Sequence, residues 1–144
     1  MKYLLDTCVV SELAKPAPNK GVVQWLGGCD EEAVFLSVLT IGEIQKGIAK
    51  LPGSARKNAI QRWLDRDLRV RFSERILVID EDVALTWGLI QGEAERRGSP
   101  IPTIDGLLGA TAVANNLTVV TRNEDDIRPT GARVLNPWKS GAEA

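Results

Sequence analysis

The sequence contains no histidine among its 144 residues, and this absence excludes several kinds of active site. Without imidazole there is no Ser-His-Asp or Cys-His nucleophile, no histidine general base and no zinc site built on histidine. Cysteine is scarce as well, because Cys8 and Cys29 are the only two and lie far apart in sequence. Such a pair predicts neither a zinc centre nor a disulfide framework, and it fits a reducing compartment.

Long apolar runs are also lacking near the N-terminus, where only Lys2 and the run Tyr3-Leu4-Leu5 precede Asp6. This is neither a signal peptide nor a membrane span, so we expect a cytoplasmic protein that does not enter a membrane. A length of 144 residues, 44% of them hydrophobic, suits one globular domain with a proper core. We expect a single domain over residues 1–138 and a flexible tail over residues 139–144.

The net charge of −1 argues against a basic nucleic-acid binder, but the charge is unevenly distributed. Residues 46–75 carry nine Lys or Arg against three acidic residues, a net +6, whereas the rest carries nine against sixteen, a net −7. A basic stretch on an acidic body is suited to meeting phosphates. The alternative is a solvated helix face, because Arg62 with Arg66, and Asp65 with Arg69, lie at i,i+4 spacing.

Short apolar runs alternate with helical segments along the whole chain. Strands are expected at residues 2–5, 33–36, 76–79, 117–120 and 132–135. Helices are expected at residues 9–15, after an Asn19 cap, and at 40–51, 54–72, 80–97 and 103–115. Because the apolar runs do not alternate with period 2, the pattern predicts an α/β fold with a buried parallel sheet.

Acidic or amide side chains stand at four of the predicted element ends. Asp6 ends the first strand, Glu43 begins the helix after the second, Asp105 begins the helix at 103–115, and Asn123 follows the strand after it. In open α/β sheets, ligands bind outside the carboxyl ends of the strands, near the point where strand order reverses. The topology therefore predicts that these four side chains converge on one edge of the sheet.

Two of these positions, and Glu124 next to a third, also have a purely structural interpretation. Thr40-x-x-Glu43 and Thr121-x-x-Glu124 both have the spacing of a capping box, in which the acid holds a helix N-terminus. Asp105 lies in a first helical turn, where an anion is favoured by about 0.3–1 kcal/mol whatever its function. Asp6 is harder to explain in this way, because a carboxylate that closes a buried strand needs partners.

Carboxylates that meet at one point repel each other unless a cation or a proton neutralises them. A site with oxygen ligands and neither imidazole nor paired thiols suits Mg²⁺ or Mn²⁺. One or two such ions promote in-line attack of water on a phosphodiester without a histidine base. The acidic residues therefore predict a divalent cation as the cofactor of this edge.

Several motifs occur in one order along almost the whole chain: Leu5-Asp6-Thr7, residues 37–44, residues 102–112, residues 119–123, and a C-terminal segment, 131–138. Together they resemble the PIN-domain family, and within it the toxin ribonucleases of the VapC/FitB type. The resemblance implies a PIN fold, with a central parallel sheet of about five strands and helices on both sides. It also implies RNA cleavage that depends on Mg²⁺ or Mn²⁺.

Residue by residue, Asp6 and Asp105 fall on the family's metal-binding aspartates. Glu43 falls on its active-site glutamate, which the resemblance implies acts through a water on the metal. Thr7 and Thr121 match hydroxyl positions that line the pocket. The resemblance further implies a small cognate antitoxin that inserts a segment into the groove, and a homodimer.

The fourth acidic position of the family falls on Asn123, an amide that brings no charge. Asp126, three residues on, matches another acidic position that is common in the group, and we keep it as a possible further ligand together with Glu43. The catalytic set expected from the sequence is therefore Asp6, Glu43, Asp105 and Asn123.

The leading hypothesis is a metal-dependent endoribonuclease, the toxin of a toxin–antitoxin pair. The amide at Asn123 keeps open a catalytically degenerate PIN domain that binds RNA or protein without cutting it. A phosphohydrolase acting on small molecules is the second alternative. An aspartyl nucleophile of that kind usually has a second Asp two residues later, where this chain has Cys8.

Overall fold

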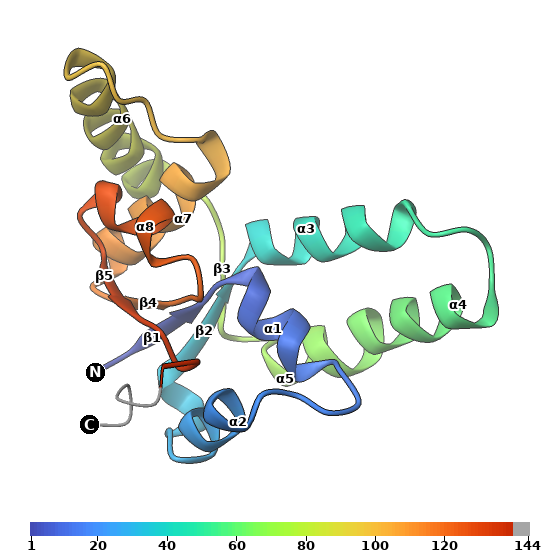
Figure 1. The fold of residues 1–144 in the computed structure, drawn as a ribbon. Helices are drawn as coiled ribbons and strands as arrows, with labels where there is room; N and C mark the ends of the chain where they lie inside the picture. Colours follow the sequence, from blue (N-terminus) through green and yellow to red (C-terminus); the bar gives the residue numbers. More distant parts are fainter. Residues whose placement is uncertain (140–144) are drawn as a thin grey trace.

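A computed structural model describes residues 1–139 and has a central sheet of five parallel strands in the order β3-β2-β1-β4-β5 (Figure 1). The strands are β1 (Tyr3–Leu5), β2 (Val34–Ser37), β3 (Ile76–Leu77), β4 (Thr118–Val120) and β5 (Arg133–Leu135). The chain runs from β1 outward to β2 and β3, and then returns to the other side of β1 as β4 and β5. The strand order therefore reverses between β1 and β4.

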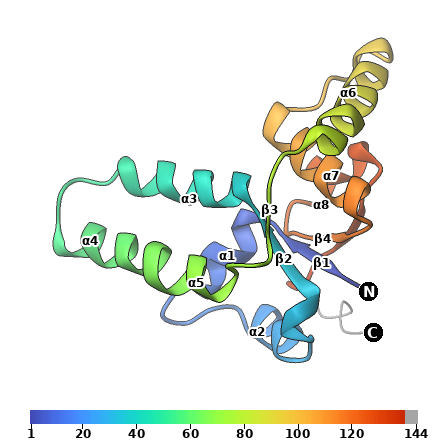
Figure 2. The same cartoon turned by 180° about the vertical axis from the view of Figure 1, so that it is seen from behind.

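Helices connect these strands and cover both faces of the sheet (Figure 2). They are α1 (Thr7–Leu13), α2 (Lys20–Gly27), α3 (Val38–Ala49), α4 (Ala55–Arg62), α5 (Arg69–Arg71), α6 (Glu81–Arg96), α7 (Thr103–Asn115) and α8 (Glu124–Ile127). Two 3₁₀ segments, η1 (Glu31–Ala33) and η3 (Arg128–Thr130), and a π-helical segment, η2 (Trp63–Leu68), complete the described secondary structure. Helices α3 and α4 form a hairpin that extends away from the sheet (Figure 1).

Successive strand residues point to opposite faces of the sheet and so divide the core in two. Leu5 and Val120 belong to the core under α1, α2, α3 and η2. Leu4 and Val119 belong to the core under α7 and α8. The central strands are buried on both faces, which explains why their sequences lack the period-2 alternation of a half-exposed sheet.

The predicted α/β class, the parallel sheet and its five strands are confirmed, and the helix at 103–115 has the predicted bounds. The single helix expected over residues 54–72 instead widens into a π-helical segment, η2, between α4 and α5. There the buried side chains are Leu64 and Leu68. The wider turn belongs to one continuous helical path that packs Leu64 and Leu68 into the core.

Both predicted capping boxes are wrong. Helix α3 begins earlier than expected, and Ser37 caps it by accepting a hydrogen bond from the N–H of Leu39 at 3.0 Å. Glu43 consequently lies in the second turn of α3, where it cannot reach the cap. The N-cap position of α8 is Asn123 rather than Thr121, so Thr121 and Glu124 also have other partners. Glu43 is thereby left without a structural role at the helix end, whereas Glu124 lies in the first turn of α8 and forms ion pairs with Arg128 and Lys139.

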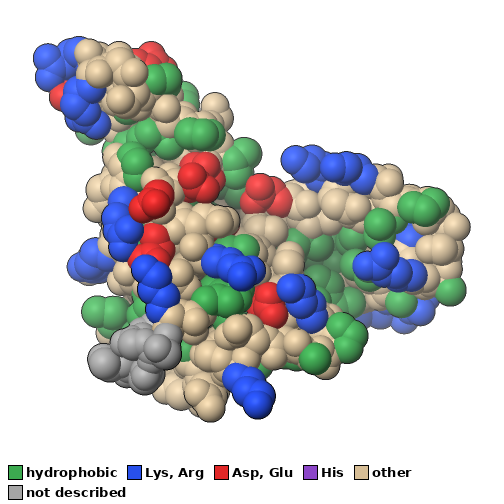
Figure 3. All heavy atoms as spheres, in the orientation of Figure 1, with side chains coloured by type: hydrophobic (Ala, Val, Ile, Leu, Met, Phe, Trp, Pro, Cys, Tyr) green, Lys and Arg blue, Asp and Glu red, His purple; other side chains and the backbone are tan. Residues whose placement is uncertain are grey.

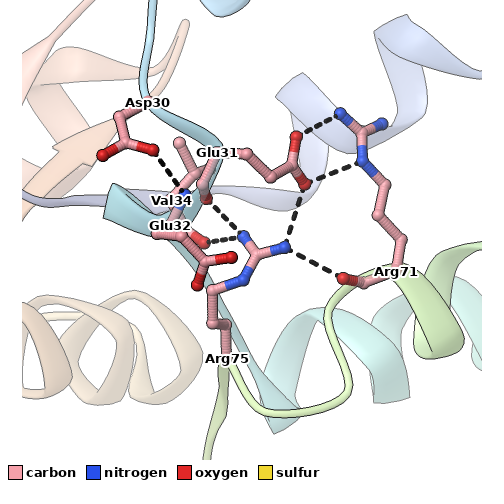
Figure 4. Close-up of polar contacts among 6 residues, drawn as sticks. All are labelled: Asp30, Glu31, Glu32, Val34, Arg71 and Arg75. Atoms are coloured by element: carbon pink, nitrogen blue, oxygen red, sulfur yellow. Dashed lines mark hydrogen bonds and ion pairs between the residues drawn. The ribbon is translucent and has the colours of Figure 1, made fainter.

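A buried arginine ties β2 to the end of the long helical segment (Figure 4). Arg75 donates to the carbonyl oxygens of Val34 and Arg71, at 2.5 and 2.9 Å, and to the carboxylate of Glu31 at 2.9 Å. Arg71 forms a bidentate pair with the same carboxylate, whose pKa falls to about 2 chiefly because of this hydrogen bonding. Part of the basic stretch at residues 46–75 is therefore structural.

Among residues 1–139, no helix has both the length and the apolar character needed to cross a membrane. The last described residue, Lys139, forms an ion pair with Glu124 at 2.6 Å. The rest of the predicted tail, residues 140–144, lies outside the described residues.

Candidate active site

Asp6 lies where the strand order reverses, and it connects the two central strands. It follows β1 and is the N-cap of α1, where its Oδ1 accepts a hydrogen bond from the N–H of Thr7 at 2.7 Å. Its Oδ2 accepts a hydrogen bond from the hydroxyl of Thr121, which follows β4, at 2.8 Å. The side chain is thus fixed at the carboxyl edge of the sheet, as the topology predicts.

Glu43 reaches the same edge from α3. Its Oε1 accepts a hydrogen bond from the hydroxyl of Thr7 at 2.6 Å, which joins α1 to α3. The Thr7 hydroxyl also lies 3.4 Å from the hydroxyl of Thr40, a fully buried residue. Thr121, Asp6, Thr7 and Glu43 therefore form one continuous polar chain across β4, β1 and α3.

Asp105 enters from the first turn of α7, on the other side of the sheet edge. Burial raises its pKa, and the charges of Asp126, Asp6 and Glu43 raise it further. Burial also raises the pKa of Asp6, despite hydrogen bonds from Thr121 and Thr7, and the charge of Glu43 adds to that effect. Asp105 thus lies within range of the charges of the other three carboxylates, and Asp6 lies within range of the charge of Glu43.

The structure distinguishes the two candidates for the fourth acidic position, Asn123 at the N-cap of α8 and Asp126 within α8. Asn123 is exposed, and its backbone N–H donates to the hydroxyl of Thr121 at 2.9 Å, while its side chain forms no cap for α8. Asp126 is also exposed, but its charge is the first of the three that raise the pKa of Asp105. The electrostatic partner of Asp105 in this segment is therefore Asp126, whereas Asn123 adds no charge.

Among residues 1–139, no ion pair offsets the acidic cluster of Asp6, Glu43, Asp105 and Asp126. In the same residues, no three acidic or cysteine side chains stand close enough together to ligate one ion directly. This spacing fits Mg²⁺, which keeps several waters and takes one or two carboxylates as ligands.

A largely apolar groove of about 650 Å³ begins at Thr7 and Glu43 and extends between α1, α3 and α4. Ile44, Ile48 and Trp63 contribute to its walls. In Figure 3, hydrophobic side chains line the hollow beside α3 and α4, and acidic side chains lie at the end next to the sheet. The groove therefore gives an extended, mostly apolar ligand access to the acidic cluster.

Comparison with known proteins agrees with this fold. The model of the PIN-domain family matches residues 3–131. Toxin FitB of Neisseria gonorrhoeae is 38% identical over 135 residues, which cover 94% of this chain and 97% of that protein. VapC ribonuclease Y4jK of Sinorhizobium fredii is 32% identical over 136 residues, which cover 94% and 97% of the two chains.

Among solved structures, FitAB bound to an IR36 DNA fragment contains a chain that is 36% identical to this one. The TM-score is 0.88, and the match covers 95% of this chain and 96% of that chain. The chain belongs to the PIN-domain family. The predicted resemblance to this family and its fold is therefore confirmed.

Sequence reasoning assigned no role in the site to two other side chains near the cluster, those of Cys8 and Thr40. The Sγ of Cys8 lies 3.7 Å from the hydroxyl of Thr121 and accepts a hydrogen bond from the N–H of Arg122 at 3.5 Å. Thr40, interpreted only as a possible helix cap, lies beside Thr7. No motif signals these contacts, because they depend on how α1, α3 and β4 meet.

The raised pKa values predict how stability depends on pH when no divalent cation is bound. A carboxyl whose pKa is raised by folding stabilises the folded state below its unfolded pKa, and this contribution is lost as pH rises through the folded pKa. The wild type should therefore lose stability relative to Asp6→Asn as the pH rises above the unfolded pKa of an aspartate, about 3.9, and through the raised folded pKa of Asp6. Urea denaturation of both proteins in EDTA checks this, and a difference independent of pH would contradict it.

Proposed function

We propose that this protein is a metal-dependent endoribonuclease, the toxin of a toxin–antitoxin pair. The observation that carries the proposal is the acidic cluster at the reversal of strand order, with four carboxylates and no ion pair among the described residues. The chain is similar to Toxin FitB and to VapC ribonuclease Y4jK over nearly the full length of both proteins, and this similarity supports RNA as the substrate. We expect the protein to act in the cytoplasm.

Asp6 and Asp105 would hold Mg²⁺ or Mn²⁺, with Glu43 and Asp126 completing the negative charge. When bound, the ion would neutralise phosphate charge and activate water for in-line attack. The mutual repulsion that raises the pKa of Asp105 supports this assignment, because a cation relieves that repulsion. The donors are all hard oxygens, which suits these two ions.

The protein side chains would orient the site and bind the substrate. Thr121 and Thr7 donate to Asp6 and Glu43, which fixes both carboxylates and leaves their other lone pairs for water or the ion. Glu43 would accept a proton from the attacking water, directly or through a second water. Lys46 on α3, Lys50 just after α3 and Arg62 on α4 are exposed and are candidates for contacts with the RNA backbone.

The apolar groove supports an antitoxin as partner. A short segment with apolar side chains would bury them against Ile44, Ile48 and Trp63 and would end at Glu43. Such a segment would cover the acidic cluster and so inhibit cleavage. A homodimer is a further part of the proposal and rests on the family alone.

The proposal is tested by incubating the purified protein with a labelled single-stranded RNA. We expect cleavage with Mn²⁺ or Mg²⁺ and none with excess EDTA, because the carboxylates alone lack a charge to stabilise the developing negative charge on phosphate. Equal cleavage with and without EDTA would contradict the proposed dependence of cleavage on a divalent cation. Mass spectrometry of the product ends distinguishes hydrolysis by this protein from cleavage by a contaminating ribonuclease.

A catalytically degenerate PIN domain remains the second candidate, favoured by the amide at Asn123. Calorimetric titration with Mn²⁺ distinguishes this degenerate domain from the metal-dependent endoribonuclease. A degenerate site would bind little metal, whereas Asp126 beside Asp105 supports binding. Faster turnover of an aryl phosphate ester than of RNA would instead favour the small-molecule phosphohydrolase.

A further inference from the structure

Arg122 lies beside the acidic cluster and has no role in the function proposed above. It directly follows Thr121, whose hydroxyl donates to Asp6 at 2.8 Å. Its own N–H donates to the Sγ of Cys8 at 3.5 Å. The backbone of Arg122 is therefore fixed at the carboxyl edge of the sheet, one residue from a group that contacts Asp6.

The side chain of Arg122 is held in one orientation by an aromatic ring. Its guanidinium carbon lies 5.3 Å from the ring centroid of Trp138, within the range of a cation–π contact. Trp138 is itself fixed, because its backbone N–H donates to the Oδ1 of Asn136 at 2.9 Å and its ring packs against the core. The guanidinium thus rests with one face on a rigid platform while its N–H edges stay accessible.

The charge of Arg122 helps to lower the pKa of Glu12, but Arg122 is not held in an ion pair as its basic neighbours are. Arg128 and Lys139 both form ion pairs with Glu124. Arg122 forms no ion pair in residues 1–139, although it is exposed and lines the same polar pocket, of about 360 Å³, as Asn123 and Asp126. A guanidinium without an ion pair therefore lines the same pocket as Asp126, one member of the acidic cluster.

We propose that Arg122 binds a phosphate of the RNA backbone next to the bond that is cut, with Trp138 as the positioning residue that holds it. This inference rests on the proposed function and names a substrate contact of that site. Guanidinium N–H groups bind phosphate oxygens in a bidentate manner, and stacking fixes their plane. The contact would also offset the repulsion between the phosphates and the four carboxylates.

The test measures binding and cleavage separately, with a fluorescently labelled single-stranded RNA. Binding is measured by anisotropy in EDTA, and cleavage is measured with Mn²⁺. Arg122→Gln should raise Kd and KM about tenfold, leave kcat within about twofold, and reduce the salt dependence of binding by about one counterion. Trp138→Leu should raise Kd about threefold. Arg122→Lys should fall between Arg122→Gln and the wild type, since it keeps the charge and loses the planar donor set.

The matched control is Arg133→Gln, which removes the same charge from an exposed residue at the amino end of β5, on the opposite edge of the sheet. If Arg122→Gln and Arg133→Gln change Kd equally, the loss of one positive charge anywhere on the protein explains the result. The proposed phosphate-binding subsite at Arg122 is then overturned. If the wild type binds RNA through Arg122 but does not cut it, the subsite stands and the proposed catalysis fails. If the wild type neither binds nor cuts RNA, both fail.

Discussion

Replacing Asp6 with Asn is expected to reduce RNA cleavage by at least about 100-fold while leaving the protein folded. Asn keeps the size of the side chain and is an equally good N-cap, so α1 should still begin where it does. What it loses is the negative charge that would hold the cation. Because burial and Glu43 raise the pKa of Asp6, the neutral amide should also leave the free protein at least as stable as the wild type at pH 7.

Two variants make this result specific to the site. Asp105→Asn should have a similar effect on cleavage, because that carboxyl belongs to the same repelling cluster. Asp80→Asn is the matched control, since Asp80 caps α6 through the N–H of Val83 at 2.9 Å, outside the acidic cluster. Single-turnover cleavage and urea denaturation of all three variants would decide the matter. Full activity in both Asp6→Asn and Asp105→Asn would eliminate the proposed metal site.

The combination of lost activity and retained stability distinguishes a functional acid from a structural one. A carboxylate that stabilises the fold has a lowered pKa, as Glu31 does beside Arg71 and Arg75, and its removal costs stability. Asp6 and Asp105 have raised pKa values, so their charge is a cost to the folded protein. Such a cost is expected where a bound ligand supplies the compensating charge.

Much of this arrangement follows from the sequence, because it depends on topology more than on local detail. Asp6 at the end of a buried strand and Asp105 at the start of a helix were sufficient to predict a common edge. Parallel strands with helical crossovers bring such residues together whatever the intervening loops do. The roles of Asp6, Glu43, Asp105 and Asn123 in catalysis remain predictions.

The sequence was less informative wherever two residues competed for one structural role. Ser37 and Thr40 are both good N-caps, and only the length of β2 decides that α3 begins after Ser37. The π-helical segment η2 was missed because its backbone hydrogen bonds span only one residue more than those of an α-helix. The contact between Arg122 and Trp138 joins two loops and carries no sequence pattern.

Gly109→Ala is expected to destabilise the protein by about 3 kcal/mol and to weaken cleavage, although Gly109 touches no substrate. A Cβ at this position would lie 2.2 to 2.5 Å from the side-chain atoms of Thr130. Thr130 cannot yield, because it is buried and its hydroxyl donates to the carbonyl of Ile127 at 2.6 Å. Helix α7 would have to move away from η3, and Asp105, one turn earlier on α7, would move with it.

The control for this variant is Gly92→Ala on α6, where an added Cβ meets nothing within 4 Å. It should raise stability by roughly 0.5–1 kcal/mol, because alanine is the better helix former. Urea denaturation of both variants gives the stability difference, and Mn²⁺ titration shows whether Asp105 has been displaced. If Gly109→Ala matched Gly92→Ala in both measurements, the close packing of α7 on η3 would not be what positions Asp105 in the acidic cluster.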